Sequence, residues 1–408
     1  MNRTIFDISS EIGSGLTPLR SNGAYWDSKD IPWVKTEQLG EYQIFDANEY
    51  ISQKALNETS IKLWPPKTVS VAMYGEGKTR GNASILMMQS TTNQACCNIV
   101  ADPQKADYRF LYYWLKNNYE QLRTLAAGVR KNLNSDDIKG FPFPDIDVAH
   151  QTRIADVLTA IDDLVQNNNC LCTELDAMAK IIYDYWFTQF DFPNTRGAPY
   201  RSSGGAMVWN EQIKREIPVG WNVGNLYAIA DPINGLACQK YRPKENEEAL
   251  PVVKIKEMHE GITVDTEQVS INIPAKHKII DGDILFSWSA TLEVMYWFGG
   301  DAGLNQHIFK VVPINGFSKE YVYHQFSAYV INFVKMAEAR KTTMGHITTE
   351  HLEQSRIVLP PDDIVQAFSK IVAPIHERIG QCQKENRELI RLRNWLLPML
   401  MNGQATVE

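Results

Sequence analysis

Two long segments that share one heptad register constrain the fold of this chain more than any other feature of its sequence. Apolar residues recur every seven positions from Ile154 and again from Phe368, and adding 214 to the first series gives the second. A segment of about 40 residues forms a helix roughly 60 Å long, which cannot fold back into a small domain. We therefore expect the two helices to pair antiparallel as a coiled coil. The predicted seam comprises Ile154, Ile161, Asn168, Leu175, Met178 and Ile182 in the first helix and Phe368, Ile375, Leu389, Leu392 and Leu396 in the second.

Several residues break the regularity of these helices, and the second seam is poorer in its middle, where Arg378 and Glu385 take seam positions. Asn168 occupies a seam position, where an asparagine fixes register in many coiled coils, although it would equally suit a contact with a second protein. Pro374 lies inside the second helix and predicts a kink. The helices form either an ordinary hairpin that buries a core or a spacer that holds two globular blocks apart. The spacer is favoured because each helix follows its own globular block.

The two halves of the chain also resemble each other outside the helices. Three short stretches recur in the same order, at offsets of 219, 212 and 214 residues. Because chance would rarely preserve both sequence and order, the matches indicate an internal duplication with small loop insertions. The matched stretches are residues 31–35 with 250–254, 93–94 with 305–306, and 133–138 with 347–352.

These patterns predict an α+β protein with an internal pseudo-two-fold repeat. Two globular α/β blocks are separated by two long antiparallel coiled-coil helices. Glycine, proline and serine residues after position 190 mark a non-helical connector. The predicted parts are a first block at 1–144, a long central helix at 145–190, a linker at 191–216, a second block at 217–360 and a long C-terminal helix at 361–403.

The charge of the chain is unevenly distributed. The whole sequence has 41 basic and 48 acidic residues, a net charge of −7. Residues 145–190 hold 8 acidic and 2 basic side chains, whereas both globular blocks are close to neutral. Bulk charge therefore neither supports nor excludes a polyanionic partner, and the acidic helix predicts a basic face on a protein that docks there.

The sequence contains none of the common motifs of catalysis or metal binding. Gly77-Lys78-Thr79 resembles the end of a phosphate-binding loop, but Ala72 stands where the first glycine is required. The six cysteines include no C-x-x-C unit, and the histidines form no metal-binding pair. We expect no catalytic residue, no metal site and no cofactor in this chain. Free thiols, and the lack of a leader or a membrane-length apolar segment, predict a cytoplasmic protein that meets no membrane.

Several motifs in the connector and the second block belong together. They are Tyr185-Trp186-Phe187, Phe190-Asp191-Phe192-Pro193, Ile217-Pro218-x-Gly220-Trp221, the stretch from Asp281 to Ser287, and Asn305-Gln306. With the architecture, these motifs resemble the DNA-specificity subunit of type I restriction–modification systems, and the resemblance covers almost the whole chain. One departure is Ser289-Ala290-Thr291, which stands where members of the family often carry glycines.

The resemblance implies a function for each part of the chain. Each globular block becomes a target-recognition domain that reads one half of a bipartite, asymmetric sequence in double-stranded DNA. The helices set the spacer between the half-sites and dock two methylation subunits, and restriction subunits join the complex for cleavage. S-adenosylmethionine is then expected in the methylation subunit and not in this chain.

Candidate DNA-binding residues are those whose side chains can reach base edges or phosphates. Arg and Lys suit guanine, Asn and Gln suit adenine, and Ser and Thr suit phosphates. The polar loops at 74–82, 128–132, 288–291 and 340–346 carry such residues, although each loop would equally suit a solvated tip. The candidates are Lys35, Tyr74, Lys78, Thr79, Arg80, Asn82, Arg130, Lys131, Asn132, Lys254, Trp288, Ser289, Thr291, Lys341, Thr342, Thr343 and His346.

Alternatives remain open for some residues and for the chain as a whole. Lys35 and Lys254 occupy matched positions and would contact phosphates, or are surface lysines that end a strand. Asn93-Gln94 and Asn305-Gln306 would contact DNA, or tie a turn. A duplicated-domain protein-interaction scaffold without DNA binding is the alternative function. Polar and basic loop tips, in place of exposed aliphatic patches, favour DNA, and the missing motifs disfavour a self-sufficient methyltransferase.

Overall fold

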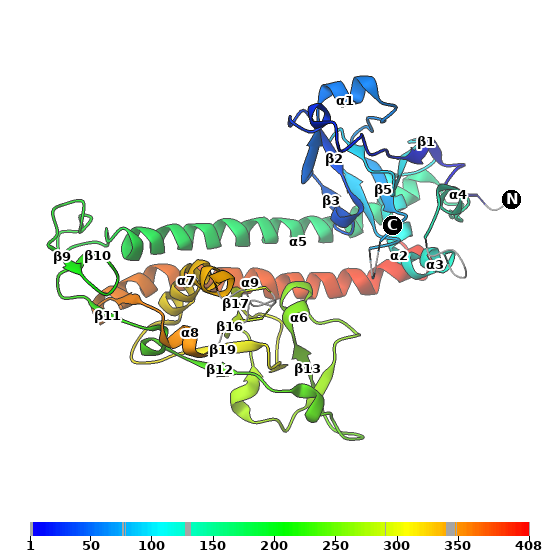
Figure 1. Ribbon diagram of the computed structural model, residues 1–408. Coiled ribbons are helices and arrows are strands. Elements are labelled where there is room, and N and C mark those ends of the chain that lie inside the picture. Colours follow the sequence, from blue (N-terminus) through cyan, green and yellow to red (C-terminus); the bar gives the residue numbers. More distant parts are fainter. Residues whose placement is uncertain are drawn as a thin grey trace. The chain divides into compact units, whose positions relative to one another are not determined.

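The two long helices predicted from the heptads are present in the structure, a computed structural model. Helix α5 spans Val148–Tyr183 and ends in a π-helical turn at Asp184–Thr188, and helix α9 spans Asp362–Met401 without interruption at Pro374 (Figure 1). The chain divides into two compact units, Met1–Val165 with Leu389–Glu408, and Gln166–Glu388, so each helix contributes to both. The structure describes residues 3–75, 77, 79–126, 132–289, 291–339, 347 and 349–407.

Contacts between the helices show that they pair antiparallel. In the second unit Asn168 of α5 lies against Asn386 of α9, and Cys172, one turn further along α5, lies against the earlier residue Ile379. In the first unit Asp162 lies against Arg393. A rising residue number in α5 therefore meets a falling number in α9, as the coiled-coil prediction requires.

One of the two predicted seam lines is displaced by one residue. Ile154 and Phe368, which begin the two series of positions spaced by seven, are buried as predicted. The second buried line lies four residues after these positions, at Leu158 and Ala179, and not three residues after them. The prediction that Met178 and Leu392 lie in the seam is therefore wrong, because their side chains are 51% and 44% exposed.

The physical reason for this displacement lies in the geometry of the α-helix. Positions three and four residues after a seam residue both neighbour it on the helix surface, and the crossing of the partner helix decides which is covered. In α5 both positions are apolar, as with Leu164 followed by Val165, so hydrophobicity alone did not distinguish them. The same shift occurs in α9, where Val372, Ile379 and Leu400 are buried and Ile371 is 46% exposed.

Among its described residues, the first unit contains two sheets and four short helices. A five-stranded sheet is ordered β1-β8-β5-β6-β3, and a three-stranded sheet is ordered β4-β2-β7. The strands are β1 (Ser9–Ser14), β2 (Ile31–Val34), β3 (Gln43–Ile44), β4 (Glu49–Ile51), β5 (Thr68–Ala72), β6 (Ala83–Leu86), β7 (Thr91–Thr92) and β8 (Cys96–Ala101). The helices are α1 (Gln53–Glu58), α2 (Tyr108–Asn117), α3 (Tyr119–Thr124) and α4 (Ser135–Lys139).

The second unit repeats this plan. Its four-stranded sheets are ordered β12-β19-β16-β17 and β14-β13-β18-β15. The strands are β12 (Ala230–Asn234), β13 (Ala249–Val253), β14 (Gln268–Ser270), β15 (Lys278–Ile279), β16 (Ile284–Ser287), β17 (Glu293–Tyr296), β18 (Ala302–Leu304) and β19 (Ile308–Pro313). The helices are α6 (Ile255–Glu260), α7 (Lys319–Ala339) and α8 (Thr349–Glu353).

The strand pairings confirm the predicted duplication. Strand β1 pairs antiparallel with β8, and β8 with β5, as β12 does with β19 and β19 with β16. Strand β2 pairs parallel with β7, as β13 does with β18. An ion pair recurs with them, because Lys35 after β2 lies 2.6 Å from Glu49, and Lys254 after β13 lies 2.6 Å from Glu267. The α+β fold with an internal repeat is thus confirmed.

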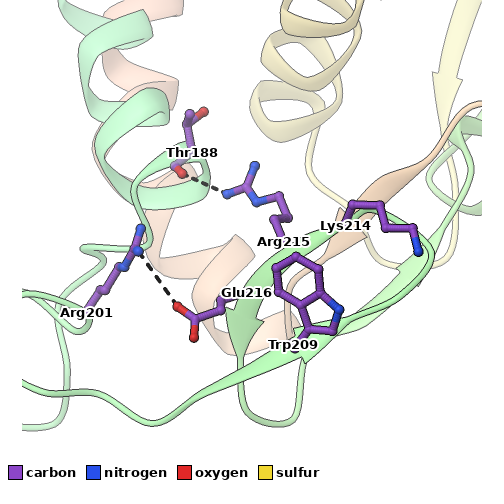
Figure 2. Close-up of a pocket in the computed structure, with 6 residues that line it drawn as sticks. All are labelled: Thr188, Arg201, Trp209, Lys214, Arg215 and Glu216. Carbon is purple, nitrogen blue, oxygen red and sulfur yellow. Dashed lines mark hydrogen bonds and ion pairs between the residues drawn. The ribbon is translucent and has the colours of Figure 1, made fainter.

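The predicted linker at 191–216 carries structure of its own. Strand β9 (Met207–Asn210) and strand β10 (Arg215–Pro218) form an antiparallel hairpin near the end of α5 (Figures 1 and 2). Strand β11 (Asn222–Gly224) then pairs with β20 (Ile357–Leu359), which leads into α9. The hairpin was missed because glycine and proline around it indicate a loop.

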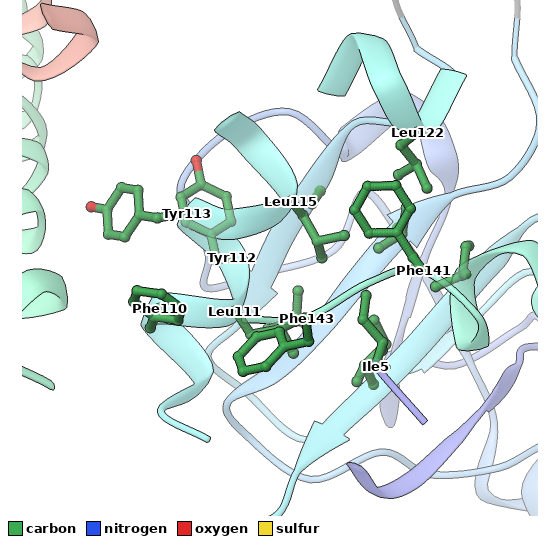
Figure 3. Packing of buried hydrophobic residues seen from close by; sticks show 14 of the residues in the cluster. Ile5, Phe110, Leu111, Tyr112, Tyr113, Leu115, Leu122, Phe141 and Phe143 are labelled. Atoms are coloured by element: carbon green, nitrogen blue, oxygen red, sulfur yellow. The ribbon is translucent and has the colours of Figure 1, made fainter. Parts of the chain in front are cut away.

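The core of the first unit forms where α2 packs on the five-stranded sheet. Phe110, Leu111 and Leu115 of α2 are fully buried with Ile5 and Phe141 from the two ends of the block (Figure 3). Their spacing of one, four and five positions places them on one face of a helix. Burial of each such side chain contributes about 1.5–3 kcal/mol, so this core holds the sheet in place beneath the loops that carry the candidate site.

Candidate nucleic-acid interface

Two segments of the first unit meet at the tip that follows β5, the one that continues from β5 and the one that leads into α4. The backbone N–H of Met73 donates to the carbonyl of Ala95 at 2.8 Å, and the N–H of Leu133 donates to the carbonyl of Met73 at 3.1 Å. The loop at 74–82 and the segment before α4 are thereby anchored to the same residue. Asn132, a predicted candidate, is exposed beside this contact.

The second unit builds its loop cluster with the same two hydrogen bonds. The N–H of Trp288 donates to the carbonyl of His307 at 3.3 Å, and the N–H of Ile347 donates to the carbonyl of Trp288 at 3.0 Å. Trp288 thus takes the place of Met73, His307 that of Ala95, and Ile347 that of Leu133. The duplication therefore extends from the strands to the loops, while the side chains on the loops differ.

Side chains of the first cluster surround a short tip. Tyr74 is 41% exposed, and Thr79 and Arg80 follow it on the same tip. The amide of Asn82 donates to the carbonyl of Leu39 at 3.3 Å, so this predicted DNA-binding residue supports the base of the tip. Thr79 is half-buried and packs closely on the backbone of Gly75, where an added Cβ would lie 2.6 Å from the Cβ of Thr79.

Arg123 of α3 is a residue of this cluster that the sequence analysis missed. Its guanidinium donates to the carbonyl of Gly77 at 2.9 Å and to the hydroxyl of Tyr119 at 3.1 Å. The same guanidinium lies 5.1 Å from the centroid of the Tyr119 ring. A tyrosine four residues before an arginine is a pairing that one helix face brings together, and this spacing was the available signal.

Side chains of the second cluster combine an indole, an imidazole and amides. The indole N–H of Trp288 donates to the side-chain oxygen of Asn234 at 3.3 Å, and its ring lies 5.5 Å from that of His307. Gln306 Nε2 lies 3.4 Å from His307 Nε2. Asn234 and His307 were missed, because only the fold brings the end of β12 beside the start of β19.

The remaining candidates of the second cluster differ in exposure. Thr291 is exposed, whereas Ser289 is buried and its carbonyl accepts the hydroxyl of Ser287 at 3.3 Å. The prediction that Ser289 presents its side chain to DNA is therefore wrong. Other predicted residues lie outside the described residues, namely Lys78, Arg130, Lys131, Lys341, Thr342, Thr343 and His346.

Asn93 and Asn305, at matched positions of the two halves, each tie a turn, which is the second of the two alternatives given for them. The side-chain oxygen of Asn93 accepts the N–H of Ala95 at 3.2 Å, and that of Asn305 accepts the N–H of His307 at 3.3 Å. Both residues thus hold the turn that enters the next strand. The same turn supports the loop cluster in each unit.

Lys35 and Lys254 are each paired with a carboxylate. Lys35 Nζ lies 2.6 Å from both Glu37 and Glu49, and these two carboxylates raise the pKa of the lysine. Lys254 Nζ lies 2.6 Å from Glu267. Each ammonium group already has a carboxylate partner on the protein surface, so the surface-lysine alternative fits the structure better.

The seam carries a layer of bonded amides in the second unit, in which Asn386 is buried, Asn168 is half-buried and Asn169 is exposed. Asn168 Nδ2 donates to the side-chain oxygen of Asn386 at 3.0 Å and to Glu385 at 3.1 Å. Asn386 Nδ2 in turn donates to the side-chain oxygen of Asn169 at 2.8 Å. Asn168 therefore bonds across the helix pair, and the alternative of a contact with a second protein is not needed to satisfy it.

Two kinds of feature are absent from the described residues. No helix within these ranges combines the length and apolarity needed to cross a membrane. Within the same ranges, no three histidine, cysteine, aspartate or glutamate side chains stand close enough to hold a metal ion.

Comparison with known proteins gives a consistent result. The family described as type I restriction modification DNA specificity domain matches residues 2–176 and again residues 218–389. The MjaIX specificity subunit of Methanocaldococcus jannaschii is 24% identical, over 98% of this chain and 92% of that protein. The HindI specificity subunit of Haemophilus influenzae is 23% identical, over 72% of this chain and 77% of that protein.

A solved structure shares the fold. The type I restriction–modification S subunit from M. genitalium superposes with a TM-score of 0.56, at 16% identity, covering 98% of this chain and 95% of that one. At this level of identity the likeness concerns the fold alone.

Proposed function

The chain belongs to the type I restriction modification DNA specificity family, and from that premise we propose that it is the subunit that selects the DNA sequence for a methylation and restriction complex. Each unit reads one half of a bipartite, asymmetric site in double-stranded DNA. The helices set the distance between the half-sites.

One observation carries this proposal most directly. The same loop cluster is built twice with the same backbone hydrogen bonds, but its side chains differ. Tyr74, Thr79 and Arg80 stand in the first cluster, where Trp288, Gln306 and His307 stand in the second. Two similar scaffolds with dissimilar side chains suit two dissimilar half-sites, because base edges are read by side chains while phosphates are held by less specific contacts.

The helices offer a surface to the methylation subunits. The displaced seam leaves apolar side chains of α5 exposed within each unit, Leu164 at 49% in the first and Met178 and Ile181 at 51% and 68% in the second. On α9, Leu392 and Trp395 are similarly exposed, at 44% and 58%. Exposed apolar side chains on a helix suit a protein partner, so we propose that two methylation subunits dock on these side chains and that restriction subunits join for cleavage.

The chemistry then belongs to the partners. We infer that this chain contributes no catalytic residue and holds no cofactor, and that S-adenosylmethionine binds to the methylation subunit. The protein acts in the cytoplasm, where the host DNA is modified. The neutral charge of both blocks supports weak DNA binding by the chain alone, since affinity for DNA depends strongly on the number of phosphates neutralised.

The proposal is tested by mapping methylated bases in a host genome with and without the gene for this chain. We expect a bipartite, asymmetric motif that disappears on deletion and returns on complementation. Methyl transfer by the purified chain alone would contradict the assignment of chemistry to the partners. An unchanged methylation map, together with no DNA binding by the assembled complex, would favour the alternative of a protein-interaction scaffold.

A further inference from the structure

A pocket of about 340 Å³ lies in the second unit between the end of α5, strands β10 and β20, and helix α7. Aromatic rings form its walls, including Phe187, Trp221 and Tyr321, all of them buried. Arg215 and Arg356 line it as well. No carboxylate is found among its lining residues in the described part of the chain.

Arg215 is a half-buried cation without an acidic partner. Its guanidinium donates to the carbonyl of Thr188 at 2.9 Å and lies 4.5 Å from the centroid of the Phe190 ring. Burial, followed by the nearby positive charge of Arg201, lowers the pKa of Arg215. No ion pair of Arg215 occurs within the described ranges, so the positive charge is balanced only by a carbonyl dipole and a ring face.

Arg356 is the second cation of this pocket and is also bound only by backbone. Its Nη1 atom donates to the carbonyl of Ser355 at 3.0 Å and to that of Glu353 at 3.3 Å. The side chain is exposed at the mouth, beside Asn332 of α7. Described carboxylates form no ion pair with it, which leaves its charge open to an anion from outside.

A second pocket, of about 440 Å³, adjoins the first and is also rich in cations (Figure 2). Arg201, Lys214 and Arg215 line it together with the exposed ring of Trp209 on the β9–β10 hairpin. Glu216 is its one acidic lining residue among those described, and it lies 3.9 Å from Arg201. Because Thr188 and Arg215 line both pockets, the two adjoin, and together, as the groove defined here, they hold four cationic side chains.

We propose that this groove, defined by the two pockets, binds an acidic segment of the methylation subunit in which carboxylates alternate with apolar side chains. The inference rests on the proposed function, which supplies that partner. Carboxylates match the unpaired guanidiniums, which bind them through paired N–H donors. Apolar side chains match the aromatic walls of the first pocket, which Phe187, Trp221 and Tyr321 form.

A protein segment fits this groove better than DNA for two reasons. Aromatic rings form the walls of the first pocket, the one of about 340 Å³. Single side chains of an extended peptide can enter it, whereas the convex backbone of a DNA duplex cannot. The groove also follows the first part of α7, from Tyr321 to Asn332, whereas the DNA-reading tip at Trp288 contacts Ile347, which follows the other end of that helix.

The test measures binding of the full-length chain to the purified methylation subunit by titration calorimetry at low and moderate salt. Arg356→Glu and Asn332→Glu change exposed side chains at the mouth, and Arg215→Glu removes the inner cation. Lys335→Glu reverses an exposed charge on the same helix outside the groove and serves as the control. We expect the Arg356→Glu and Arg215→Glu variants to bind roughly tenfold or more weakly, with the control within about twofold of wild type.

Thermal unfolding of each variant separates lost binding from lost folding, and Arg356→Glu is decisive if Arg215→Glu fails to fold. Normal binding by both mouth variants would overturn the groove assignment and leave the proposed function intact. Loss of DNA affinity with normal methylation-subunit binding would assign the groove to the DNA backbone and also overturn it. Self-association of the chain that Arg356→Glu abolishes would assign the groove to a second copy. A wild-type chain that binds no methylation subunit would contradict the proposed function itself.

Discussion

Asp162 joins three elements of the first unit through one buried carboxylate. It lies on α5, accepts the hydroxyl of Tyr113 from α2 at 2.7 Å, and forms an ion pair with Arg393 of α9. Its side chain is 3% exposed and that of Arg393 is 13% exposed. Burial, followed by the charge of Arg393, also lowers the pKa of the neighbouring Lys116 to about 8. The polar groups here depend on one another.

Removal of this carboxylate is expected to destabilise the first unit strongly. Asp162→Ala leaves Arg393 buried without its acid, which costs about 3–5 kcal/mol. Asp163→Ala removes an exposed neighbour and is expected to change stability by no more than about 0.5 kcal/mol. The shift of the thermal midpoint measures both, and equal shifts would contradict the role given to Asp162.

Two buried histidines make the second unit sensitive to acid. Burial lowers the pKa of His324 to about 3 and that of His376 to about 4, with their rings 5.1 Å apart. The charge of Lys180 further lowers the pKa of His324, whereas the charge of Glu320 raises that of His376. Between about pH 4 and 6.5 the unfolded chain therefore binds protons that the folded chain does not, so the unfolding free energy falls as the pH falls through this range.

The expected slope is up to about 2.7 kcal/mol per pH unit for two histidines, at 1.36 kcal/mol each. Stability from this source is complete above about pH 6.5. Chemical unfolding at pH 7.5, 6 and 5 measures the slope, and His324→Phe is expected to remove about half of it. A slope that His324→Phe leaves unchanged would show that other groups cause the acid sensitivity.

At the scale of elements, the sequence predicted what depends on periodicity and order. The two helices, their common register and the duplicated blocks follow from spacings that recur along the chain. The choice between Met178 and Ala179 did not, because both are apolar and only the crossing of α9 decides which is covered. The contact between Asn234 and Trp288, and the position of Arg215 away from every described carboxylate that could pair with it, depend on contacts between distant segments, which no local pattern records.

The adjacent residues Met178 and Ala179, one exposed and one buried, give a matched pair of variants. Ala179→Glu places a charge in the fully buried seam and is expected to destabilise the second unit by several kcal/mol. Met178→Glu changes the adjacent exposed position and is expected to leave the free energy of unfolding within about 0.5 kcal/mol of wild type. If the exposed side chains of α5 dock the methylation subunits, Met178→Glu weakens their binding in titration calorimetry. If Met178→Glu instead destabilised the fold strongly, Met178 would lie in the seam, as the sequence predicted.

At the scale of the whole molecule, the proposal assigns base choice to the units and spacing to the helices. Seven residues inserted after Asn167 in α5, with seven after Asn386 in α9, keep Asn168 opposite Asn386. One heptad adds about 10.5 Å and leaves the helix face about 20° out of phase. The spacer in the methylated motif is expected to grow by about three base pairs at 3.4 Å each, with both half-sites unchanged. Altered half-site bases in the methylation map would contradict this division of roles.

The amide layer of the seam also bears on how the protein is made. By the offset of 214, a second copy of α5 in the place of α9 would set Asn168 opposite Cys172, where Asn386 now accepts its hydrogen bond. Helix α5 leaves the ribosome about 180 residues before α9 begins, roughly 10–40 s at usual rates of translation. During that interval neighbouring nascent chains offer one another only copies of α5. That pairing leaves the half-buried Asn168 without the amide that Asn386 supplies, so α5 remains available for the helix synthesised last in its own chain.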